Sequence, residues 1–354
     1  MTPLQHPDWP AGDLESPPAC ELCGSARRQP WLDGLVDRAF GVAPGRWQLQ
    51  RCTDCGVAAL NPRPTEASIG RAYQGYYTHD AGPERHFIVP GDRPDLPIKR
   101  ALHADFYNQT WGHRLAPALW PGRWLIGGIA ARRARAGHTI RHLPAPSQAG
   151  AQLLDVGCGS GSFLRVARTL GFAAQGIEID PAAGALARDA GFNVFAGPLG
   201  AAQFGAASFE HITLNHVIEH LHRPLHALRQ LLGWLRPGGR IWLQTPNLAS
   251  RGAARYGAHW RGLEPPRHLT LFDATTLPAA LAAAGFERAS LLAPQRDAGF
   301  FIQQSEAMAA GQDPYRAGRP SRAQKRLARE WDAASLRDWG SAEAITVQAW
   351  RPLA

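Results

Sequence analysis

The chain has 354 residues, enough for one large hydrophobic core and an appendage, which suggests about two domains. Its formal net charge of +9 permits a nucleic-acid or anionic membrane partner, but only Lys99 and Lys325 are lysines. Genome base composition explains such an arginine bias as readily as a binding surface does, so a nucleic-acid partner is disfavoured. Residues 1–11 lack the apolar core of a signal peptide, and no apolar run reaches the roughly 18 residues of a membrane span. We therefore expect a cytoplasmic protein.

The N-terminal part of the chain carries a cysteine pattern. Residues 1–19 are rich in proline and are expected to form a flexible tail. Four of the five cysteines then form two Cys-x-x-Cys pairs, each followed by glycine: Cys20, Cys23, Cys52 and Cys55. Two such pairs place four thiolates around a tetrahedral zinc ion, and a cytosolic location disfavours disulfides. Residues 24–51 exceed the usual spacing of a zinc ribbon. We therefore expect residues 20–80 to form a small structural zinc-binding module with strands at 47–51 and 57–60.

Residues 81–150 are predicted to form a linker and a helical cap. A helical pattern extends over residues 98–142, with three tryptophans and a basic end. Tryptophan and arginine on one amphipathic helix are typical of a peripheral membrane contact, here through residues 118–141. We favour the alternative, a cap whose apolar face packs over the next domain, because Pro121 and Gly122 interrupt the helix.

The segment Leu153–Gly161 joins an apolar strand to a loop with glycine at every second position. Glycine permits φ > 0 and a close approach of the backbone to a ligand. The helix expected at 163–170 directs its first amide groups at the same place. A second strand, expected at 173–179, carries Glu178 near its end, where a carboxylate can accept both hydroxyls of a ribose. A nicotinamide-binding loop requires glycine where this chain has Ser162, so the loop is predicted to bind a cofactor other than NAD.

Strands and helices alternate over the rest of the chain, which is typical of a parallel, doubly wound α/β sheet. Further elements are expected as strands at 193–196, 209–214 and 240–245 and as helices at 224–235 and 275–284. The turn Arg236–Gly239, Arg-Pro-Gly-Gly, separates a helix from a strand. Two more strands are expected at 288–293 and 344–350. A long insertion, 295–341, lies between them, with a helix expected at 321–335; loops of this length are functional or disordered.

Several of these residues resemble the class I S-adenosylmethionine-dependent methyltransferases. The first motif of that family is similar to Asp155–Gly161, its second strand ends in an acid like Glu178, and its later motifs are similar to Glu219–Leu221 and Arg236–Gly239. The ubiquinone-pathway O-methyltransferases are a recognisable relative. The block 245–269 is similar to a bacterial subgroup associated with glycan and secondary-metabolite pathways. The N-terminal cysteine module is similar in outline to the zinc-bearing sugar C-methyltransferases, but the sequence departs from theirs after the second cysteine pair.

This resemblance implies a fold, a cofactor and a cofactor site. Residues 151–354 are expected to form a Rossmann-like, seven-stranded methyltransferase sheet whose last two strands are an antiparallel hairpin, with S-adenosylmethionine as the cofactor. The implied cofactor-binding residues are Asp155, Gly157, Gly159, Gly161, Glu178, Leu199 and Asn215. Many relatives follow the third strand with an acid that recognises adenine. This chain has Gly197–Leu199 there, so the backbone and the apolar side chain of Leu199 are expected to hold the adenine.

Three histidines are candidates for acid–base catalysis: His216, His220 and His268. The first two follow the fourth strand, at the edge of the sheet where ligands bind, and a histidine can accept a proton from a hydroxyl group near neutral pH. Two alternatives stay open. His216, Glu219 and His220 lie at i, i+3 and i+4 and could hold a divalent ion such as magnesium, as the ubiquinone-pathway resemblance implies. Glu219 and His220 could instead be structural. Trp260 and Arg267 are expected to line the acceptor pocket.

The sequence therefore predicts methyl transfer from S-adenosylmethionine to an oxygen of a small hydroxylated acceptor, such as a sugar, a glycan precursor or a secondary metabolite. The alternative enzyme is an rRNA or tRNA methyltransferase that binds RNA through the zinc module. However, the chain has Thr245–Asn247, Thr-Pro-Asn, where enzymes that methylate base amino groups carry Asn/Asp-Pro-Pro and an aromatic residue. The alternative without catalysis is a silent cofactor-binding scaffold.

Overall fold

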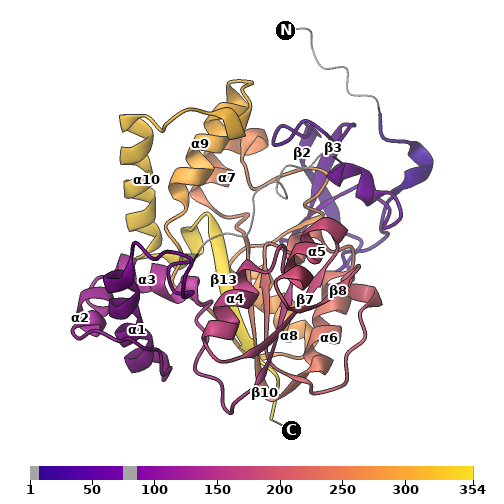
Figure 1. The fold of residues 1–354 in the computed structure, drawn as a ribbon. Helices are drawn as coiled ribbons and strands as arrows, with labels where there is room; N and C mark the ends of the chain where they lie inside the picture. The colour runs from indigo at the N-terminus through magenta and orange to yellow at the C-terminus, as the bar shows by residue number, and fades with distance from the viewer. Residues whose placement is uncertain (1–7, 75–85, 354) are drawn as a thin grey trace.

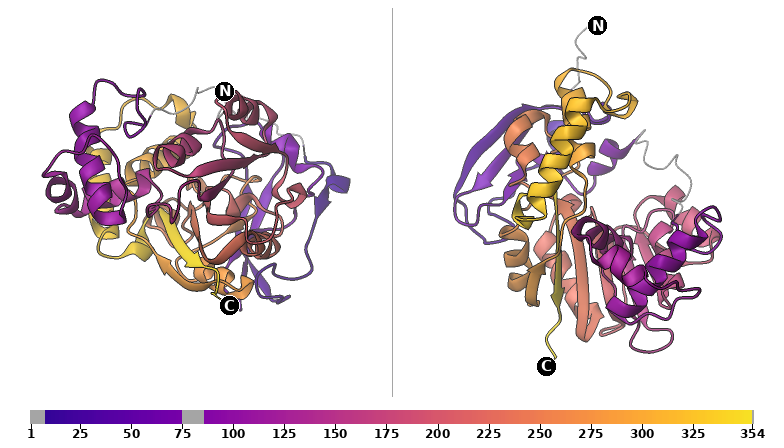
Figure 2. Two further views of the ribbon diagram at one scale, coloured as in Figure 1. Left: turned by 60° about the horizontal axis from the view of Figure 1, so that its bottom comes forward. Right: turned by 90° about the vertical axis from the view of Figure 1, so that its left-hand side faces the viewer.

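The computed structural model describes residues 8–74 and 86–353 of the chain (Figure 1). Residues 1–7 of the expected tail, and residues 75–85 between the expected zinc module and the cap, lie outside the described residues. A large sheet with flanking helices occupies the centre of the molecule, and a smaller sheet and two groups of helices surround it (Figures 1 and 2).

The large sheet has seven strands in the order β12-β13-β10-β9-β6-β7-β8. Their bounds are β6 (Gln152–Val156), β7 (Ala173–Glu178), β8 (Asn193–Ala196), β9 (Phe209–Asn215), β10 (Leu235–Pro246), β12 (Glu287–Leu291) and β13 (Ala344–Trp350). β13 is antiparallel to both β10 and β12, and the other neighbouring pairs are parallel. The expected Rossmann-like seven-stranded sheet is therefore confirmed. The turn expected at Arg236–Gly239 is instead an irregularity within β10, where the pairing with β9 shifts between Leu235 and Arg240.

Helices pack against both faces of the large sheet. Their bounds are α4 (Ser162–Thr169), α5 (Pro181–Asp189), α6 (Pro224–Trp234) and α8 (Thr276–Ala284). Successive residues of a strand point to opposite faces. Leu154 packs in the same core as α6 and α8, and Leu153 packs in the core that contains α4. The Asp180 side chain caps α5 by accepting hydrogen bonds from two amide groups of its first turn. The sequence pattern of alternating strands and helices thus gives two covered faces and leaves the carboxyl edge of the strands for loops.

A second sheet of four strands contains the N-terminal part of the chain. It has the order β11-β4-β3-β2, with bounds β2 (Arg28–Leu35), β3 (Trp47–Cys52), β4 (Ala58–Leu60) and β11 (Thr270–Leu271). All its pairs are antiparallel. Because β11 follows β10 in the chain, the cysteine-bearing segment shares a sheet with the methyltransferase-like domain. The N-terminal sheet is a fused layer of that domain.

The expected tail is ordered from residue 8 onward. Trp9 is buried and packs edge-on against Trp47, with ring centroids 5.4 Å apart. The following residues form η1 (Ala11–Asp13) and β1 (Leu14–Glu15), and β1 pairs with β5 (Arg63–Pro64). The expectation of a flexible tail is therefore corrected for residues 8–19. Burial of the Trp9 ring and pairing with β5 supply contacts that the proline-rich composition did not reveal.

The expected long helical segment consists of three shorter helices, α1 (Pro97–Trp111), α2 (Gly122–Gly127) and α3 (Ala130–Thr139). Their inner side chains, such as Phe106 and Ile140, share a hydrophobic core with Phe163 and Val166 of α4. α1–α3 therefore form a cap that packs against the α4 side of the large sheet, at the lower left of Figure 1.

The insertion between β12 and β13 is folded. It contains α9 (Ala298–Ala309), η7 (Pro314–Arg316), α10 (Arg322–Ser335) and η8 (Trp339–Ser341). The predicted helix at 321–335 is confirmed, and Ser321 and Gln324 form a capping box at its start. α9 and α10 contact each other, and α9 also contacts α7 (Arg251–Tyr256), so these helices form a group above the carboxyl edge of the sheet (Figure 1).

Within residues 8–74 and 86–353, no helix has both the length and the apolar character that a membrane span requires.

Candidate active site

The glycine loop after β6 has the backbone conformation that its sequence predicts. Gly157, Gly159 and Gly161 have φ of +71°, +53° and +84°, values that other residues rarely adopt. A Cβ atom at Gly157 would lie 2.5 Å from Cγ2 of Val217, whereas a Cβ atom at Gly159 would have no heavy atom within 4 Å. The loop is therefore closely packed at its first glycine and borders open space at the second, where a ligand can approach the backbone.

Glu178 lies at the end of β7, directly beside this loop. Its Oε2 accepts a hydrogen bond from the Gly159 amide at 2.7 Å, and its Oε1 accepts one from the Asp180 amide at 2.9 Å. These bonds hold the carboxylate at the carboxyl edge of the sheet, where Asn215 ends β9. The sequence spacing between the loop and the acid thus corresponds to a spatial contact, and this edge fits a ribose-containing cofactor.

Two other expected cofactor residues, Asp155 and Leu199, are buried. Asp155 is buried and interacts with Arg141 and with the Thr213 hydroxyl, which donates to its Oδ1 at 2.8 Å. Burial raises the pKa of Asp155, while the Arg141 charge and the hydrogen bonds oppose this shift. Leu199 begins η4 (Leu199–Ala201), and its side chain is buried in the main core. The structure therefore places Leu199 as a core residue, because the short helix turns its side chain inward.

His216 follows β9 at the carboxyl edge and is held by a buried acid. It has a φ of +53°, a strained conformation for a non-glycine residue. Its Nδ1 lies 3.2 Å from Oε1 of Glu219, and 40% of the His216 side chain is exposed while the Glu219 side chain is fully buried. The Thr245 hydroxyl donates to the other Glu219 oxygen at 3.0 Å. Burial alone would raise the pKa of Glu219, but the hydrogen bond from His216 and the surrounding histidines lower it to about 2, so the carboxylate is ionised.

His220 ends η5 (Ile218–His220) and contacts the N-terminal sheet layer. Its Nδ1 lies 3.0 Å from the Tyr73 hydroxyl and 3.0 Å from the Arg267 carbonyl oxygen. Tyr73 ends η2 (Ile69–Tyr73), and burial raises its pKa well above the ordinary tyrosine value. Sequence reasoning missed this contact, because Tyr73 and His220 lie far apart in the chain and no local spacing relates them.

His268 is buried beside His220, with the two rings in an edge-on contact at 4.7 Å. Its Nδ1 donates to the Gly262 carbonyl oxygen at 2.8 Å. Burial lowers the pKa of His268 to about 4, so its Nε2 keeps a lone pair at neutral pH. The structure thus brings together two of the three predicted histidines, His268 buried and His220 partly buried, and leaves His216 as the exposed one.

Trp260 and Arg267, expected to line the acceptor pocket, are structural residues. The Trp260 indole is buried and donates to Oε2 of Glu343 at 3.1 Å. The Arg267 guanidinium is fully buried and pairs with Asp37 at 2.5 Å and with Glu264 at 3.0 Å. Both side chains join separate segments of the chain. Their expected role is therefore corrected, because each is enclosed by its own buried carboxylate partners.

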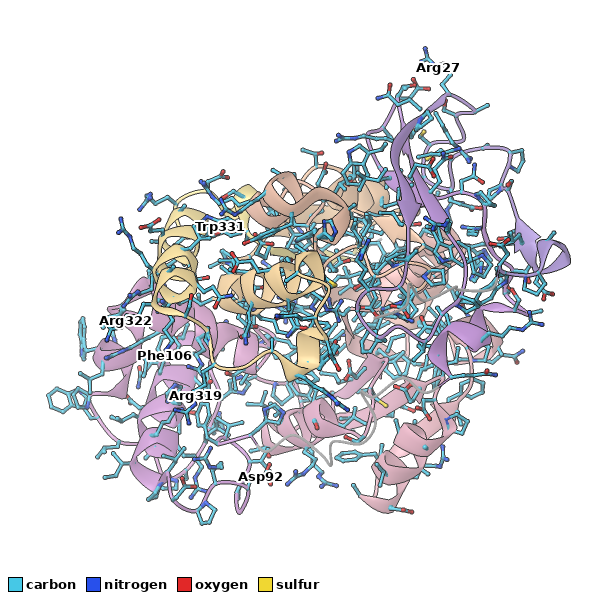
Figure 3. All side chains as sticks on the ribbon, turned by 90° about the horizontal axis from the view of Figure 1, so that it is seen from above. Arg27, Asp92, Phe106, Arg319, Arg322 and Trp331 are labelled. Atoms are coloured by element: carbon cyan, nitrogen blue, oxygen red, sulfur yellow. The ribbon has the colours of Figure 1, made fainter. Side chains whose placement is uncertain are left out.

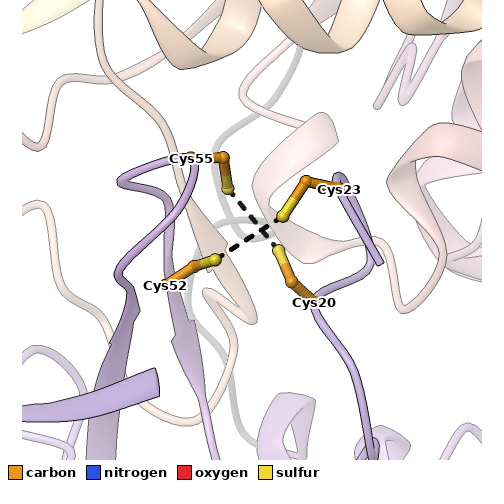
Figure 4. Close-up of side chains that lie close together, drawn as sticks. All are labelled: Cys20, Cys23, Cys52 and Cys55. Atoms are coloured by element: carbon orange, nitrogen blue, oxygen red, sulfur yellow. Dashed lines mark hydrogen bonds between the residues drawn. The ribbon is translucent and has the colours of Figure 1, made fainter. Parts of the chain in front are cut away.

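The four paired cysteines converge on one point (Figure 4). Sγ of Cys20 lies 3.6 Å from Sγ of Cys55, and Sγ of Cys23 lies 3.6 Å from Sγ of Cys52. Four sulfurs at the usual zinc–sulfur distance of about 2.3 Å lie about 3.8 Å apart in a tetrahedron. The amides of Gly24 and Gly56 each donate to the carbonyl oxygen of the first cysteine of their pair, so both pairs form the same type of turn. The arrangement fits a structural zinc ion with no open position.

A second group of metal-ligating side chains lies at the carboxyl edge. One ligand atom each from Glu219, His220 and His268 lies within 4.8 Å of the other two. His216, which the sequence placed in such a group, instead uses its Nδ1 to contact Glu219. Two imidazoles and one carboxylate suit a transition metal, whereas magnesium prefers oxygen ligands throughout. These residues therefore do not fit the magnesium ion considered from sequence.

Comparison with known proteins agrees with this geometry. Residues 129–291 match the family model described as a methyltransferase domain. Together with the seven-stranded sheet and the glycine loop beside Glu178, this match supports a class I S-adenosylmethionine-dependent methyltransferase domain in this part of the chain.

Among curated proteins, the chain is similar to ubiquinone biosynthesis O-methyltransferases. It is 32% identical to the Caulobacter vibrioides protein over 130 residues, 34% of this chain and 52% of that protein. It is 32% identical to the Xanthomonas axonopodis protein over 146 residues, 38% of this chain and 60% of that protein. The chain thus matches little more than half the length of these relatives.

Solved structures resemble the chain at lower identity. An S-adenosylmethionine-dependent methyltransferase from Mesorhizobium loti has a TM-score of 0.41 and 20% identity, covering 64% of this chain and 100% of that one. A methyltransferase from Archaeoglobus fulgidus has a TM-score of 0.42 and 15% identity, covering 64% of this chain and 97% of that one.

Proposed function

We propose that the protein transfers the methyl group of S-adenosylmethionine to an oxygen of a small hydroxylated acceptor, with His216 as the general base. The contact between the ionised carboxylate of Glu219 and Nδ1 of His216, at 3.2 Å, carries the proposal. The similarity to curated O-methyltransferases supports oxygen as the methylated atom.

The geometry favours His216 over the other two histidines as the base. The Glu219 carboxylate can only accept a hydrogen bond, so Nδ1 of His216 carries the proton and Nε2 keeps its lone pair. The side chain of His216 is 40% exposed, so an acceptor hydroxyl can reach it. By contrast, His268 is buried, and Nδ1 of His220 contacts Tyr73 and the Arg267 carbonyl.

The remaining residues of the site bind the cofactor and orient the base. When bound, the cofactor supplies an electrophilic methyl group on a positively charged sulfur. The glycine loop and Glu178 hold the nucleoside part at the carboxyl edge. Glu219 is a positioning residue: it fixes the tautomer of His216 and stabilises the imidazolium that forms when His216 takes the acceptor proton.

We further propose that Cys20, Cys23, Cys52 and Cys55 bind one structural zinc ion. The sulfur positions and the paired turns support this proposal. Its role would be to stabilise the N-terminal part of the chain, in which the Tyr73 hydroxyl contacts Nδ1 of His220.

A screen with methyl-labelled S-adenosylmethionine and a panel of catechols, hydroxybenzoates and nucleotide sugars would test the activity. We expect a labelled O-methyl product. With that acceptor, His216→Ala is expected to lower kcat by about a hundred- to ten-thousandfold with the affinity for S-adenosylhomocysteine unchanged. Glu219→Gln should lower kcat, because the tautomer of His216 is no longer fixed. The exposed His226 on α6 provides a matched control, and His226→Ala should leave kcat unchanged.

Full turnover by His216→Ala would overturn the assignment of the base. A labelled product on a base nitrogen of tRNA or rRNA would establish the nucleic-acid alternative. Cofactor binding with no product from any acceptor would favour the silent scaffold.

A metal centre at Glu219, His220 and His268 is the second candidate arrangement. It is favoured because the Nδ1 atoms of both histidines lie at hydrogen-bond distance from backbone carbonyl oxygens, the usual outer contacts of metal-bound imidazoles. Elemental analysis separates the two arrangements. One metal ion per chain corresponds to the cysteine site alone. Two ions, with one lost in His268→Ala, would assign a metal to this edge.

A further inference from the structure

The outer surface of the helical cap is apolar and basic at the same time. Six of the twelve exposed large hydrophobic side chains among the described residues lie on α1–α3 and the links between them: Ile98, Leu119, Trp120, Trp124, Leu125 and Ile129. Trp120 is 75% exposed and Trp124 is 61% exposed, whereas Ile126 of the same helix is buried in the cap core. The cap thus has an inner apolar face that packs against α4 and an outer one that packs against nothing within the described part of the chain.

The segments that carry these exposed side chains are tied to one another by hydrogen bonds. The Leu119 amide donates to the Ala101 carbonyl oxygen at 3.0 Å, which fixes the start of α2 against α1. The guanidinium of Arg132 donates to the Leu125 carbonyl oxygen at 3.0 Å, which fixes α3 against α2. We call the surface made by Leu119, Trp120, Arg123, Trp124, Leu125, Ile129, Arg132 and Arg133 the Trp–Arg face.

The arginines of the Trp–Arg face have few acidic neighbours; Asp105 of α1 accepts a hydrogen bond from the Arg123 amide at 2.7 Å. Residues 106–154 contain no aspartate or glutamate. Within the described residues, no carboxylate lies within ion-pair distance of Arg123, Arg132 or Arg133, and the Arg123 guanidinium stacks on the Trp124 ring at 4.7 Å. The pKa of the nearby Lys99 is lowered, first by partial burial and then by the charges of Arg135 and Arg93.

Helix α10 also carries exposed cations. Arg322, Lys325 and Arg329 of α10 are exposed. Figure 3 shows Arg319 and Arg322 on the side of Phe106 of the cap, with Arg27 at the opposite end of the molecule. In the right-hand view of Figure 2, α10 and α1–α3 both lie in front of the sheet.

We propose that the Trp–Arg face docks the protein on an anionic lipid surface. Exposed tryptophans with aliphatic neighbours insert at the headgroup level, and arginines beside them pair with lipid phosphates. A second copy of this chain is disfavoured, because a two-fold contact would bring the same unpaired arginines together. RNA is disfavoured, because four of the six exposed apolar side chains are aliphatic and offer no ring for base stacking. The proposal does not depend on the acceptor or on the catalytic base.

Co-sedimentation of the full chain with vesicles tests the proposal. We expect binding to vesicles of phosphatidylcholine and phosphatidylglycerol at a 7:3 ratio, weak binding to pure phosphatidylcholine, and loss of binding at high salt. The double variant Trp120→Ser/Trp124→Ser should weaken binding at least tenfold, and Arg132→Gln/Arg133→Gln should reduce it and its salt dependence. Trp120 and Trp124 are exposed, so thermal unfolding and cofactor affinity should not change in the tryptophan double variant.

Two matched controls lie away from the face. Leu353 is 79% exposed near the C-terminus, and Arg27 lies in the N-terminal layer. Leu353→Ser and Arg27→Gln should bind vesicles like the wild type. Equal binding by the tryptophan double variant, or binding that ignores lipid charge, would overturn the proposal. Absence of vesicle binding would also overturn the proposal. In that case, a change in oligomer mass in the tryptophan double variant, measured by light scattering, would indicate a contact between copies of the chain, and a change in retention of a labelled RNA would indicate an RNA contact.

Discussion

Gly159 is the residue at which the chain leaves room for a ligand. Its φ of +53° and the open space within 4 Å of the position that a Cβ atom would take distinguish it from Gly157, whose Cβ would meet Val217. The Gly159 amide also donates to Glu178, so one residue both opens the site and positions its acid.

We expect Gly159→Val to reduce the affinity for S-adenosylhomocysteine by at least a hundredfold, because the valine side chain would fill the space beside the loop and strain the backbone. Isothermal titration calorimetry measures this change. Gly200→Val is a matched control, since a Cβ atom there also has no neighbour within 4 Å and Gly200 lies outside the loop. Wild-type affinity in Gly159→Val would contradict the cofactor site.

At the scale of elements, the N-terminal sheet is joined to the large domain by buried charges. Arg267, which follows the Pro-Pro turn before β11, pairs with Asp37 between β2 and β3, and neither side chain is exposed. β11 itself pairs with β4. The cysteine cluster lies at the far end of the same sheet, so these contacts couple it to the loop that carries His268.

Removing one partner of this buried pair is expected to be costly. Arg267→Met should lower the free energy of unfolding by about 3–5 kcal/mol, because Asp37 is then left buried without its cation. Urea unfolding measures the change. Arg27→Met, at the exposed Arg27–Asp54 pair, should cost less than about 1 kcal/mol. Equal effects of the two substitutions would show that Arg267 does not stabilise the joint between the layers.

The cysteine cluster is expected to hold one zinc ion, and Cys52→Ser should lose it. Hydrogen exchange should then accelerate in β3 and β4, because the turn that begins at Cys52 loses its cross-link. Elemental analysis and exchange mass spectrometry measure the two effects. Cys158→Ser, which changes the fifth cysteine in the glycine loop, should retain zinc. A zinc-free wild type with freely reactive thiols would refute a structural metal.

At the scale of the whole molecule, several histidines are buried without charge. Burial lowers the pKa of His138, His211 and His268 to about 4. In the unfolded chain each has a pKa near 6.5, so the unfolded state takes up these protons first as the pH falls. Stability is therefore complete above about pH 6.5 and is lost as the pH falls from 6.5 toward 4.

This linkage predicts a loss of about 2 kcal/mol for each of these histidines between pH 7 and pH 5. Urea unfolding at both values measures the total. In His138→Gln the glutamine amide can donate the hydrogen bond to the Ala293 carbonyl oxygen in place of the imidazole. The number of protons taken up on unfolding should then fall by about one. Because both proteins keep the cysteine site, the difference between them excludes zinc release as the cause. The same pH dependence in both would contradict a neutral, buried His138.

Local patterns in the sequence determined most elements of the large sheet. Alternating strands and helices, the glycine loop and the spacing to Glu178 act over short stretches of chain, and the order of the strands follows from the family that these motifs resemble. The paired cysteines likewise predicted their own convergence, because two short turns of the same kind leave few other arrangements.

Only the tertiary structure decided which side chains meet across long distances in sequence. It set Tyr73 against His220, Arg267 against Asp37, and β11 against β4. It buried Leu199, expected as an adenine contact from the family resemblance, and His268, a candidate base, and it exposed Trp120 and Trp124 on the cap. The physical reason is that burial and pairing depend on the packing of whole layers, whereas a motif reports only the backbone and the residues near it.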